Sequence, residues 1–346
     1  MPSIYELINA KEVAKRWNQK ARERKPFLGE MLFPVKKQLG TSLEYIKGAH
    51  GSIKPLMLSA YDAKAIPVGR EAFSKLTAEL PFFKNSKNVN EKMRQNLNNL
   101  ISGGNKQVID IVVNDIFDDK SNLLTNADIT REMMRMQALT TGSVAFSSNG
   151  QSLSFDYQVP NSNKVTPKVK WDVYATADPI SDIIDWKQLV VEATGDNVSA
   201  MVLNSTTLKH IGKCESVKNA VYVFGDGKVT VNTARVKEYI LQETGLTTYV
   251  YDKGYKNDSN AFVKFVADGT VAMFPDGALG NTVFGTTPEE SDLLSGSDAK
   301  VEIVDTGVAV TTIKEKDPVN VMTKVSMVCL PSMEKADSLI IASVLS

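Results

Sequence analysis

Ser42-Leu43-Glu44-Tyr45-Ile46-Lys47 and Phe73-Ser74-Lys75-Leu76-Thr77-Ala78-Glu79-Leu80 are two stretches in which polar and apolar side chains roughly alternate. Such alternation is typical of strands with one apolar face. The segment between them is punctuated by Gly48, Gly51, Pro55, Pro67 and Gly69. The sequence therefore predicts an extended hairpin over about residues 42–87. Because an isolated hairpin is only marginally stable in water, we expect its apolar face to lie on another surface.

The residues before this hairpin predict an amphipathic helix. Ser3 and Glu6 form a capping box, and apolar residues recur at helical spacing as far as Trp17, so we expect the helix to end near Asn18. It is either a surface helix of its own domain or an arm that docks on a neighbour. No apolar run in this first part of the chain could close a core, which favours contact with another copy of the chain. The predicted intersubunit contacts are Ile4, Leu7, Ile8, Trp17, Leu43, Tyr45, Ile46, Phe73, Leu76 and Leu80.

Composition indicates a soluble globular chain. The 346 residues are 42% hydrophobic and 23% charged, which is ordinary for one or two packed domains. No run of about 18 apolar residues and no signal-like N-terminus is present, so we expect a cytoplasmic protein without membrane contact. Cys214 and Cys329 are expected to be small buried apolar residues rather than a disulfide.

The zero net charge hides an asymmetry along the chain. Residues 1–88 contain sixteen Lys and Arg against eight acids, a charge of +8, so the remainder carries −8. Complementary halves of one chain can meet between chains. The basic part could also contact nucleic acid without sequence preference, because neutralising phosphates needs only Lys and Arg density.

The rest of the chain predicts an α+β arrangement. Residues 88–119 are expected to form a helix in two pieces separated by Gly103-Gly104, and a third helix is expected from Thr125 to Gly142. Asn149-Gly150 predicts the turn of a hairpin over 143–157. Asp178-Pro179 predicts the start of a helix over 180–193. Beyond it we expect helices over 205–211 and 233–243, and strands over 198–203, 220–224, 229–231, 247–251, 261–267, 271–274, 301–303, 308–313, 322–330 and 338–344.

No motif for catalysis, cofactor binding or metal binding is evident. His50 and His210 have no cysteine or carboxylate at ligand spacing around them. Gly225-Asp226-Gly227 lacks the third glycine of a dinucleotide motif and precedes a predicted strand rather than a helix. We therefore expect no enzyme activity, no cofactor and no metal site.

The order of several segments resembles the lambda-type phage major capsid protein E family. The resemblance covers nearly the whole length of the chain. The segments that carry it are Ile4-Tyr5-Glu6-Leu7, Phe27-Leu28-Gly29-Glu30-Met31-Leu32-Phe33-Pro34, Tyr45-Ile46-Lys47-Gly48, Leu58-Ser59-Ala60-Tyr61-Asp62-Ala63-Lys64-Ala65, Glu79-Leu80-Pro81-Phe82-Phe83, Arg131-Glu132-Met133-Met134-Arg135-Met136-Gln137-Ala138-Leu139-Thr140-Thr141-Gly142, Phe274-Pro275-Asp276-Gly277 and Gly285-Thr286-Thr287-Pro288-Glu289.

This resemblance implies the tailed-phage major capsid fold. Its parts would be an N-arm (1–41), an extended E-loop hairpin (42–87), a P-domain with a spine helix (88–175 and 326–346) and a mixed α/β A-domain (176–325). It further implies a virion capsid protein that self-assembles, in the cytoplasm of a bacterial host, into hexamers and pentamers of an icosahedral head. The implied partners are scaffold and portal proteins, a decoration protein, and packaged double-stranded DNA contacted non-specifically.

Two other functions stay open at this stage. A cargo-enclosing protein compartment could share the shell fold, and a soluble cytoplasmic α/β ligand-binding protein could carry an unpaired arm. The second predicts a monomer in solution, whereas a shell protein predicts closed particles.

Overall fold

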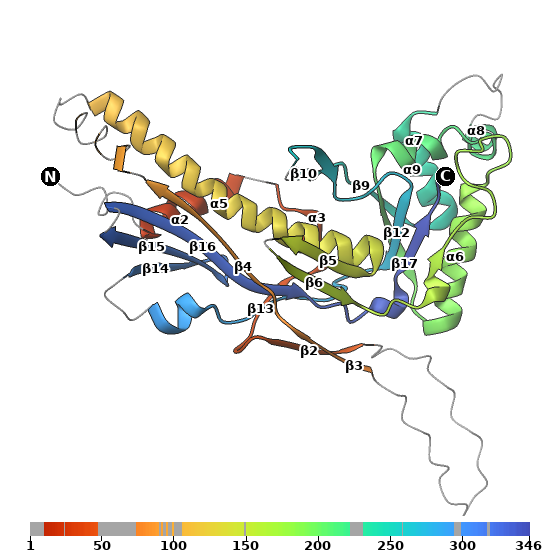
Figure 1. The fold of residues 1–346 in the computed structure, drawn as a ribbon. Coiled ribbons are helices and arrows are strands. Elements are labelled where there is room, and N and C mark those ends of the chain that lie inside the picture. The colour runs from red at the N-terminus through yellow and green to blue at the C-terminus, as the bar shows by residue number, and fades with distance from the viewer. Residues whose placement is uncertain are drawn as a thin grey trace, which may run out of the picture.

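The chain folds around one long helix, a long sheet and a second sheet with its own helices (Figure 1). The computed structural model describes residues 10–346 except 24, 48–73, 90, 93–94, 96–98, 100–105, 149, 222–230, 258, 294–298 and 317–318; within 106–120 it describes the side chain of residue 117 only. The predicted α+β class is confirmed.

Helix α5 (Lys106–Thr141) is the longest element, with 36 residues. The sequence predicted an interruption before Thr125, and that prediction was wrong. No glycine or proline lies between residues 106 and 141. The Thr125 hydroxyl donates backwards to the Ser121 carbonyl oxygen (3.3 Å), as threonines inside helices do, instead of capping a new helix. The predicted end at Gly142 is confirmed, with a left-handed φ of 72°.

The long sheet lies along α5. Its strand order is β1-β13-β16-β15-β14, and β4 also pairs with β16. The strands are β1 (Val35–Lys37), β4 (Phe82–Val89), β13 (Thr282–Phe284), β14 (Ala299–Val304), β15 (Val308–Lys316) and β16 (Val319–Pro331). The sequence did not predict β4, although all eight of its residues pair with 321–328 of β16. Residues 82–89 therefore belong to the body of the molecule rather than to a protruding loop.

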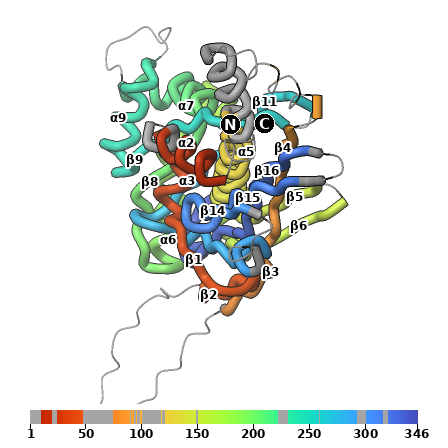
Figure 2. Tube along the Cα trace, turned by 90° about the vertical axis from the view of Figure 1, so that its left-hand side faces the viewer, coloured from red at the N-terminus to blue at the C-terminus, as the bar shows by residue number. Residues whose placement is uncertain are grey.

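Helix α2 (Ala10–Glu23) packs against α5 and the long sheet. Ala10, Val13, Ala14 and Trp17 are each at most 4% exposed and belong to the same apolar cluster as α5 and the long sheet. Figure 2 shows α2 on one side of α5 and β4 and β16 on the other. Of the two interpretations of this helix, the structure supports a surface helix of its own domain. The helix also continues five residues past its expected end at Asn18, because no helix breaker occurs before Pro26. Its predicted capping box lies outside the described residues.

The predicted hairpin is present as β2 (Ser42–Lys47) and β3 (Ser74–Glu79), which pair antiparallel. Its apolar face is indeed covered, but by the same chain: Leu43, Tyr45, Leu76 and Leu80 all lie in the first apolar cluster. The Lys47 ammonium anchors the end of β2 on the Asp337 carboxylate (2.9 Å). The described part of this face is therefore covered without a neighbouring subunit, and its contact with a neighbour stays a prediction.

A second unit surrounds the sheet β7-β17-β12-β8-β9. Its strands are β7 (Lys164–Val165), β8 (Val198–Leu203), β9 (Thr247–Val250), β12 (Thr270–Pro275) and β17 (Ile340–Ser343), and its helices are α6 (Pro179–Thr194), α7 (Ser205–Ile211), α8 (Glu215–Val221) and α9 (Thr233–Thr244). The Asp178 cap is confirmed, since its carboxylate accepts from the Ser181 amide (3.3 Å). A strand over 220–224 was wrong where it is described, because residues 220 and 221 end α8. The expected strand over 229–231 lies outside the described residues except for residue 231.

The remaining described elements are short. They are α3 (Leu28–Leu32), the hairpins β5 (Ser143–Ser148) with β6 (Gln151–Asp156) and β10 (Gly254–Lys256) with β11 (Phe262–Lys264), and the short helical turns η1 (Asn161–Asn163), η2 (Glu289–Leu293) and η3 (Ala336–Ser338). The hairpin around Asn149-Gly150 is confirmed by its register.

The two sheets divide the chain differently from the predicted domain boundaries. The expected boundary between residues 325 and 326 cuts through β16. Strands β14 and β15 belong to the long sheet, although they lie within 176–325. Strand β17 belongs to the second sheet, although it lies within 326–346. Strand pairing between residues far apart in sequence sets these boundaries, and local patterns do not report it.

Replacing Trp17 with alanine tests whether α2 is part of the folded body. Trp17 is 4% exposed and its indole N–H donates to the Asp305 carboxylate (3.2 Å). We expect Trp17→Ala to lower the free energy of unfolding of the unassembled chain by about 3–5 kcal/mol, measured by urea denaturation. Lys15→Ala, on the exposed face of the same helix, should change it by less than about 0.5 kcal/mol. Equal stability of the two variants would show that α2 is not packed on its own chain.

Candidate assembly site

A buried carboxylate in the C-terminal half of α5 joins three separate parts of the chain. Glu132 is completely buried. Its Oε1 accepts hydrogen bonds from the Gly29 amide (3.1 Å) and the Tyr251 hydroxyl (2.7 Å). The Arg135 guanidinium lies 3.7 Å from its Oε2 and donates through Nε to the Thr282 hydroxyl (2.8 Å). We call Gly29, Glu132, Arg135, Tyr251 and Thr282 the Glu132 joint.

The Glu132 joint also fixes the segment that leads into β1. The Thr282 hydroxyl, which accepts from Arg135, donates to the Phe33 carbonyl oxygen (2.9 Å). A Cβ placed on Gly29 would lie 2.5 Å from Glu132 Oε2, so only glycine allows the backbone to come this close to the carboxylate. The approach of residues 28–33 to α5 therefore depends on a residue with no side chain.

Burial shifts the ionisation of both charged groups in the joint. It raises the pKa of the Glu132 carboxyl, against the opposing effects of the two hydrogen bonds and the Arg135 charge. It also lowers the pKa of the Arg135 guanidinium, which the Glu132 charge opposes. Removing one partner of such a buried pair typically costs about 3–5 kcal/mol, because the other charge is left uncompensated. Separating Glu132 from Arg135 would therefore destabilise the folded chain.

A second charged group lies next to the Glu132 joint on α5. Arg131, 5% exposed, bonds to the Asp128 carboxylate and lies 3.4 Å from Asp305 in the turn between β14 and β15. The same Asp305 carboxylate accepts from the Trp17 indole, so this group ties α2, α5 and the long sheet together. Asp128, Arg131, Glu132 and Arg135 follow helical spacing, and in the sequence such a stripe looks like a solvated helix face. The sequence alone does not indicate that these residues are buried, because strands from distant parts of the chain cover them.

Aromatic rings complete the contact between the first residues of the chain and the second unit. The Phe265 ring lies 6.3 Å from Phe27, 6.1 Å from Tyr251 and 5.8 Å from Tyr255, measured between ring centroids. The Lys253 ammonium lies 4.5 Å above the Phe27 ring, within the range of a cation–π contact. Residue 27 is thus held by residues that follow β9.

The residues predicted to contact a neighbouring subunit fall into three groups. Ile4, Leu7, Ile8 and Phe73 lie outside the described residues. Trp17, Leu43, Tyr45, Leu76 and Leu80 are at most 8% exposed within their own chain, so their apolar surface is already covered. Ile46 is 53% exposed and keeps surface for a neighbour. Contact of any of these residues with another subunit stays a prediction.

The described part of the chain offers little for small-molecule chemistry. Within it, no group of three or more His, Cys, Asp or Glu residues is placed to hold a metal ion. His210 Nδ1 lies 3.0 Å from the Tyr174 hydroxyl, and both cysteines are buried and free. Burial raises the pKa of the Cys214 and Cys329 thiols to about 12 each, which makes a reactive thiolate scarce near neutral pH. The described helices include none with the length and apolarity that a membrane crossing requires.

This architecture is that of tailed-phage capsid proteins. A prophage protein of Escherichia coli CFT073 described as a capsid protein matches with a TM-score of 0.60 at 13% identity, covering 97% of this chain and 99% of that one. A phage-related protein from Bordetella bronchiseptica RB50 matches with a TM-score of 0.54 at 10% identity over 95% and 96% of the two chains. The capsid of cyanophage A-1(L) matches with a TM-score of 0.51 at 12% identity over 92% of each chain. At these identities the likeness shows the fold.

The family follows from a separate comparison. The model of the family described as phage major capsid protein E matches residues 9–344. This chain belongs to the phage major capsid protein E family, and its role is structural, as a subunit of a phage capsid. A search of curated protein sequences found no match. The resemblance identified in the sequence, and the fold it implied, are confirmed.

The hydrogen bond from Tyr251 to Glu132 can be tested with a matched pair of tyrosines. Tyr251→Phe removes a donor to a buried carboxylate, so we expect the free energy of unfolding to fall by about 1.5–3 kcal/mol. Tyr255→Phe removes a hydroxyl from a ring that packs on the same Phe265, and should cost less than about 0.5 kcal/mol. Urea denaturation of the unassembled chains measures both. Similar losses in the two variants would mean that the hydroxyl of Tyr251 contributes nothing to the joint.

Proposed function

We propose that copies of this chain form the hexamers and pentamers of an icosahedral phage head that encloses double-stranded DNA. The observation that carries this proposal is membership of the major capsid family over nearly the whole chain, together with the matching fold. Shells of this kind gain stability from many modest contacts repeated around closed symmetry, even when each contact is weak. The proposed role needs no catalysis, and we propose that the chain has none. We place its assembly in the cytoplasm of a bacterial host.

The parts of the capsid fold can be assigned with boundaries that follow the sheets. Helix α5 and the long sheet would form the P-domain, with α5 as its spine helix, and the unit around the second sheet would form the A-domain. The N-arm would be the residues before β2. The E-loop would be β2, β3 and the residues 48–73 between them. Strand β4 is excluded from the E-loop because it pairs with β16.

The base of the E-loop is formed by β2 and β3, which pack on their own chain. The part of the loop beyond this base would contact a neighbouring subunit. Strands β2 and β3 pair only with each other in the described part of the chain, and they leave the body of the molecule at one side (Figure 1). The buried side chains of β2 and β3 fix the orientation of this base relative to the rest of the subunit. Ile46, near the outer end of β2, would begin the surface that a neighbouring subunit covers.

The basic first part of the chain would bind the packaged DNA or a scaffold protein. Lys11, Lys15, Lys25 and Lys36 have exposed side chains. Such a set suits non-specific contact with DNA phosphates, or with acidic surfaces of a scaffold protein during assembly. We propose that scaffold, portal and decoration proteins complete the head.

Replacing residues 48–73 with Asn-Gly tests whether the E-loop is required for the shell. Lys47 and Ser74 are paired across the hairpin, so a two-residue type I′ turn can close it there. We expect this variant to have a wild-type urea midpoint, because all packed residues of β2 and β3 remain, and to form no closed shells by electron microscopy.

A second variant separates the sequence of the loop from its length. It carries a Gly/Ser segment of equal length in place of 48–73, and we expect it also to fold without closing shells. Closed shells formed by either variant would contradict a role of this loop in assembly.

A further inference from the structure

The hairpin β10–β11 presents an aromatic residue between lysines. Lys256 is directly opposite Phe262, and Gly254 is opposite Lys264, so these four residues share one face of the hairpin. The Phe262 side chain is 61% exposed, and Lys256 is exposed beside it. The Phe262 ring lies against Gly254, where a Cβ would be 2.7 Å from its Cζ. The hairpin therefore holds an exposed phenyl ring in a defined position next to a positive charge.

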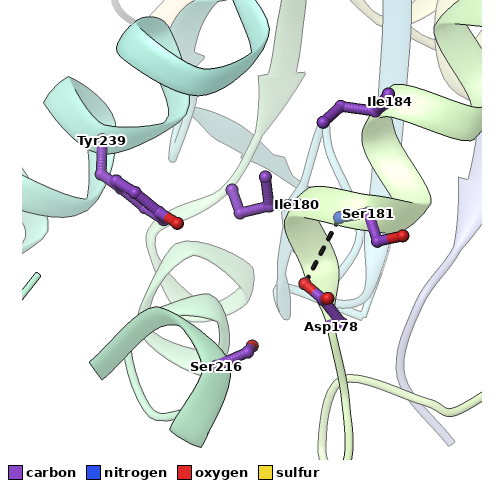
Figure 3. Close-up of a pocket in the computed structure, with 6 residues that line it drawn as sticks. All are labelled: Asp178, Ile180, Ser181, Ile184, Ser216 and Tyr239. Atoms are coloured by element: carbon purple, nitrogen blue, oxygen red, sulfur yellow. Dashed lines mark hydrogen bonds between the residues drawn. The ribbon is translucent and has the colours of Figure 1, made fainter. Parts of the chain in front are cut away.

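A hollow of about 300 Å³ opens at the beginning of α6. It is lined by Asp178, Ile180, Ser181 and Ile184 from α6 and its cap, Ser216 from α8 and Tyr239 from α9. Figure 3 shows the Tyr239 ring pointing from α9 toward Ile180, with Ile184 on the next turn of α6. Ile184 is 45% exposed, although it is a large apolar residue. The hollow thus combines an apolar wall with a few polar groups, as binding pockets do.

The rim of this hollow is negatively charged. Asp178 lines it, and Asp182 and Asp185 follow on α6. Asp178, Asp182 and Asp185 are spaced at i, i+4 and i+7, so their carboxylates lie on one face of α6 at its beginning. Burial raises the pKa of the Asp182 carboxyl and the charges of Asp178 and Asp185 raise it further, against the hydrogen bond from the Trp171 indole. Lys168 partly offsets them. A ligand with an apolar group beside a cation would match both the wall and the rim.

The hairpin and the hollow lie on different sides of the second unit. Figure 1 shows β10 on the side of the second sheet that faces α5, and α6 on the far side. Two complementary patches on different sides of one unit cannot meet within a chain. They can meet between copies, and such a head-to-tail contact generates a ring when the rotation closes.

We propose that Phe262 of one copy inserts into the hollow at α6 of the next copy, with Lys256 facing the carboxylates of Asp178 and Asp185. The occupant of the hollow is a second copy of this chain, and the contact repeats around a capsomer. The inference rests on the proposed function and adds to it the surfaces that close the ring. A buried aromatic anchor in a pocket, with opposite charges at its edge, is the arrangement that concentrates binding energy in protein interfaces.

A double variant, Phe262→Cys with Ile184→Cys, tests this contact by disulfide formation. Both positions are exposed, and the natural cysteines are buried, so the new thiols react selectively. After assembly and mild oxidation, we expect a ladder of linked chains on a non-reducing gel that ends at five and six chains. The matched control, Phe262→Cys with Leu241→Cys, places the second thiol on an exposed position of α9 outside the hollow. It should remain at least tenfold less linked.

The outcomes separate this contact from the proposed function. Closed shells without the ladder overturn the contact and leave the shell function intact; the hollow then has another occupant. A link within a single chain also overturns it. Failure of the wild-type chain to form any shell, with scaffold present, would count against the proposed function itself.

Charge reversal gives an independent readout of the same contact. Lys256→Glu should lower the yield of shells at least tenfold, and adding Asp185→Lys should restore most of it. Lys209→Glu, at an exposed lysine of α7 outside both patches, should leave the yield unchanged. Equal loss in Lys256→Glu and Lys209→Glu, or no restoration by the second change, contradicts the proposed pairing.

Discussion

The Glu132 carboxylate is the constraint on which the rest of the structure depends. It is fully buried, and it accepts hydrogen bonds from a backbone amide near the start of the chain and from a hydroxyl of the second unit, with a guanidinium of its own helix 3.7 Å away. A buried charge without such partners would destabilise the fold by several kcal/mol. The chain must therefore bring residues 29, 251 and 282 to one point on α5, and this requirement links the arm segment, the long sheet and the second unit.

This packing limits the apolar surface that the described part of the subunit offers to its neighbours. The described parts of the helix and the hairpin that looked unsupported in the sequence pack on their own chain, so the apolar side chains of these parts are mostly buried before assembly. Among the described residues, the exposed features that remain for a neighbour include Ile46 at the hairpin and the Phe262 hairpin with its complementary hollow. Covering apolar side chains within the subunit reduces indiscriminate association, while the patches that stay exposed can be specific.

Local chemistry was predictable from the sequence, and long-range pairing was not. Alternation predicted β2 and β3, Asn149-Gly150 predicted the β5–β6 hairpin, and Asp178-Pro179 predicted the start of α6, because each signal depends only on neighbours in sequence. The burial of Leu43 and Trp17 by distant strands, and the pairing of β4 with β16, carry no local signal. The Glu132 joint was missed for the same reason: charges at helical spacing look solvated until strands from elsewhere cover them. Family resemblance supplied the global arrangement that periodicity could not.

Native-state hydrogen exchange of the unassembled chain tests the central role of the Glu132 joint most directly. The Gly29 amide donates to Glu132, so in the wild-type chain it should exchange only at the rate set by global unfolding. In a Glu132→Ala variant, amides of residues 28–38 and 251–265 should exchange at least tenfold faster than those of α6 and α9, under conditions in which the chain is folded. Uniform exchange across all these segments in the variant would contradict the account, because it would show that the arm segment and the second unit are held without the buried carboxylate.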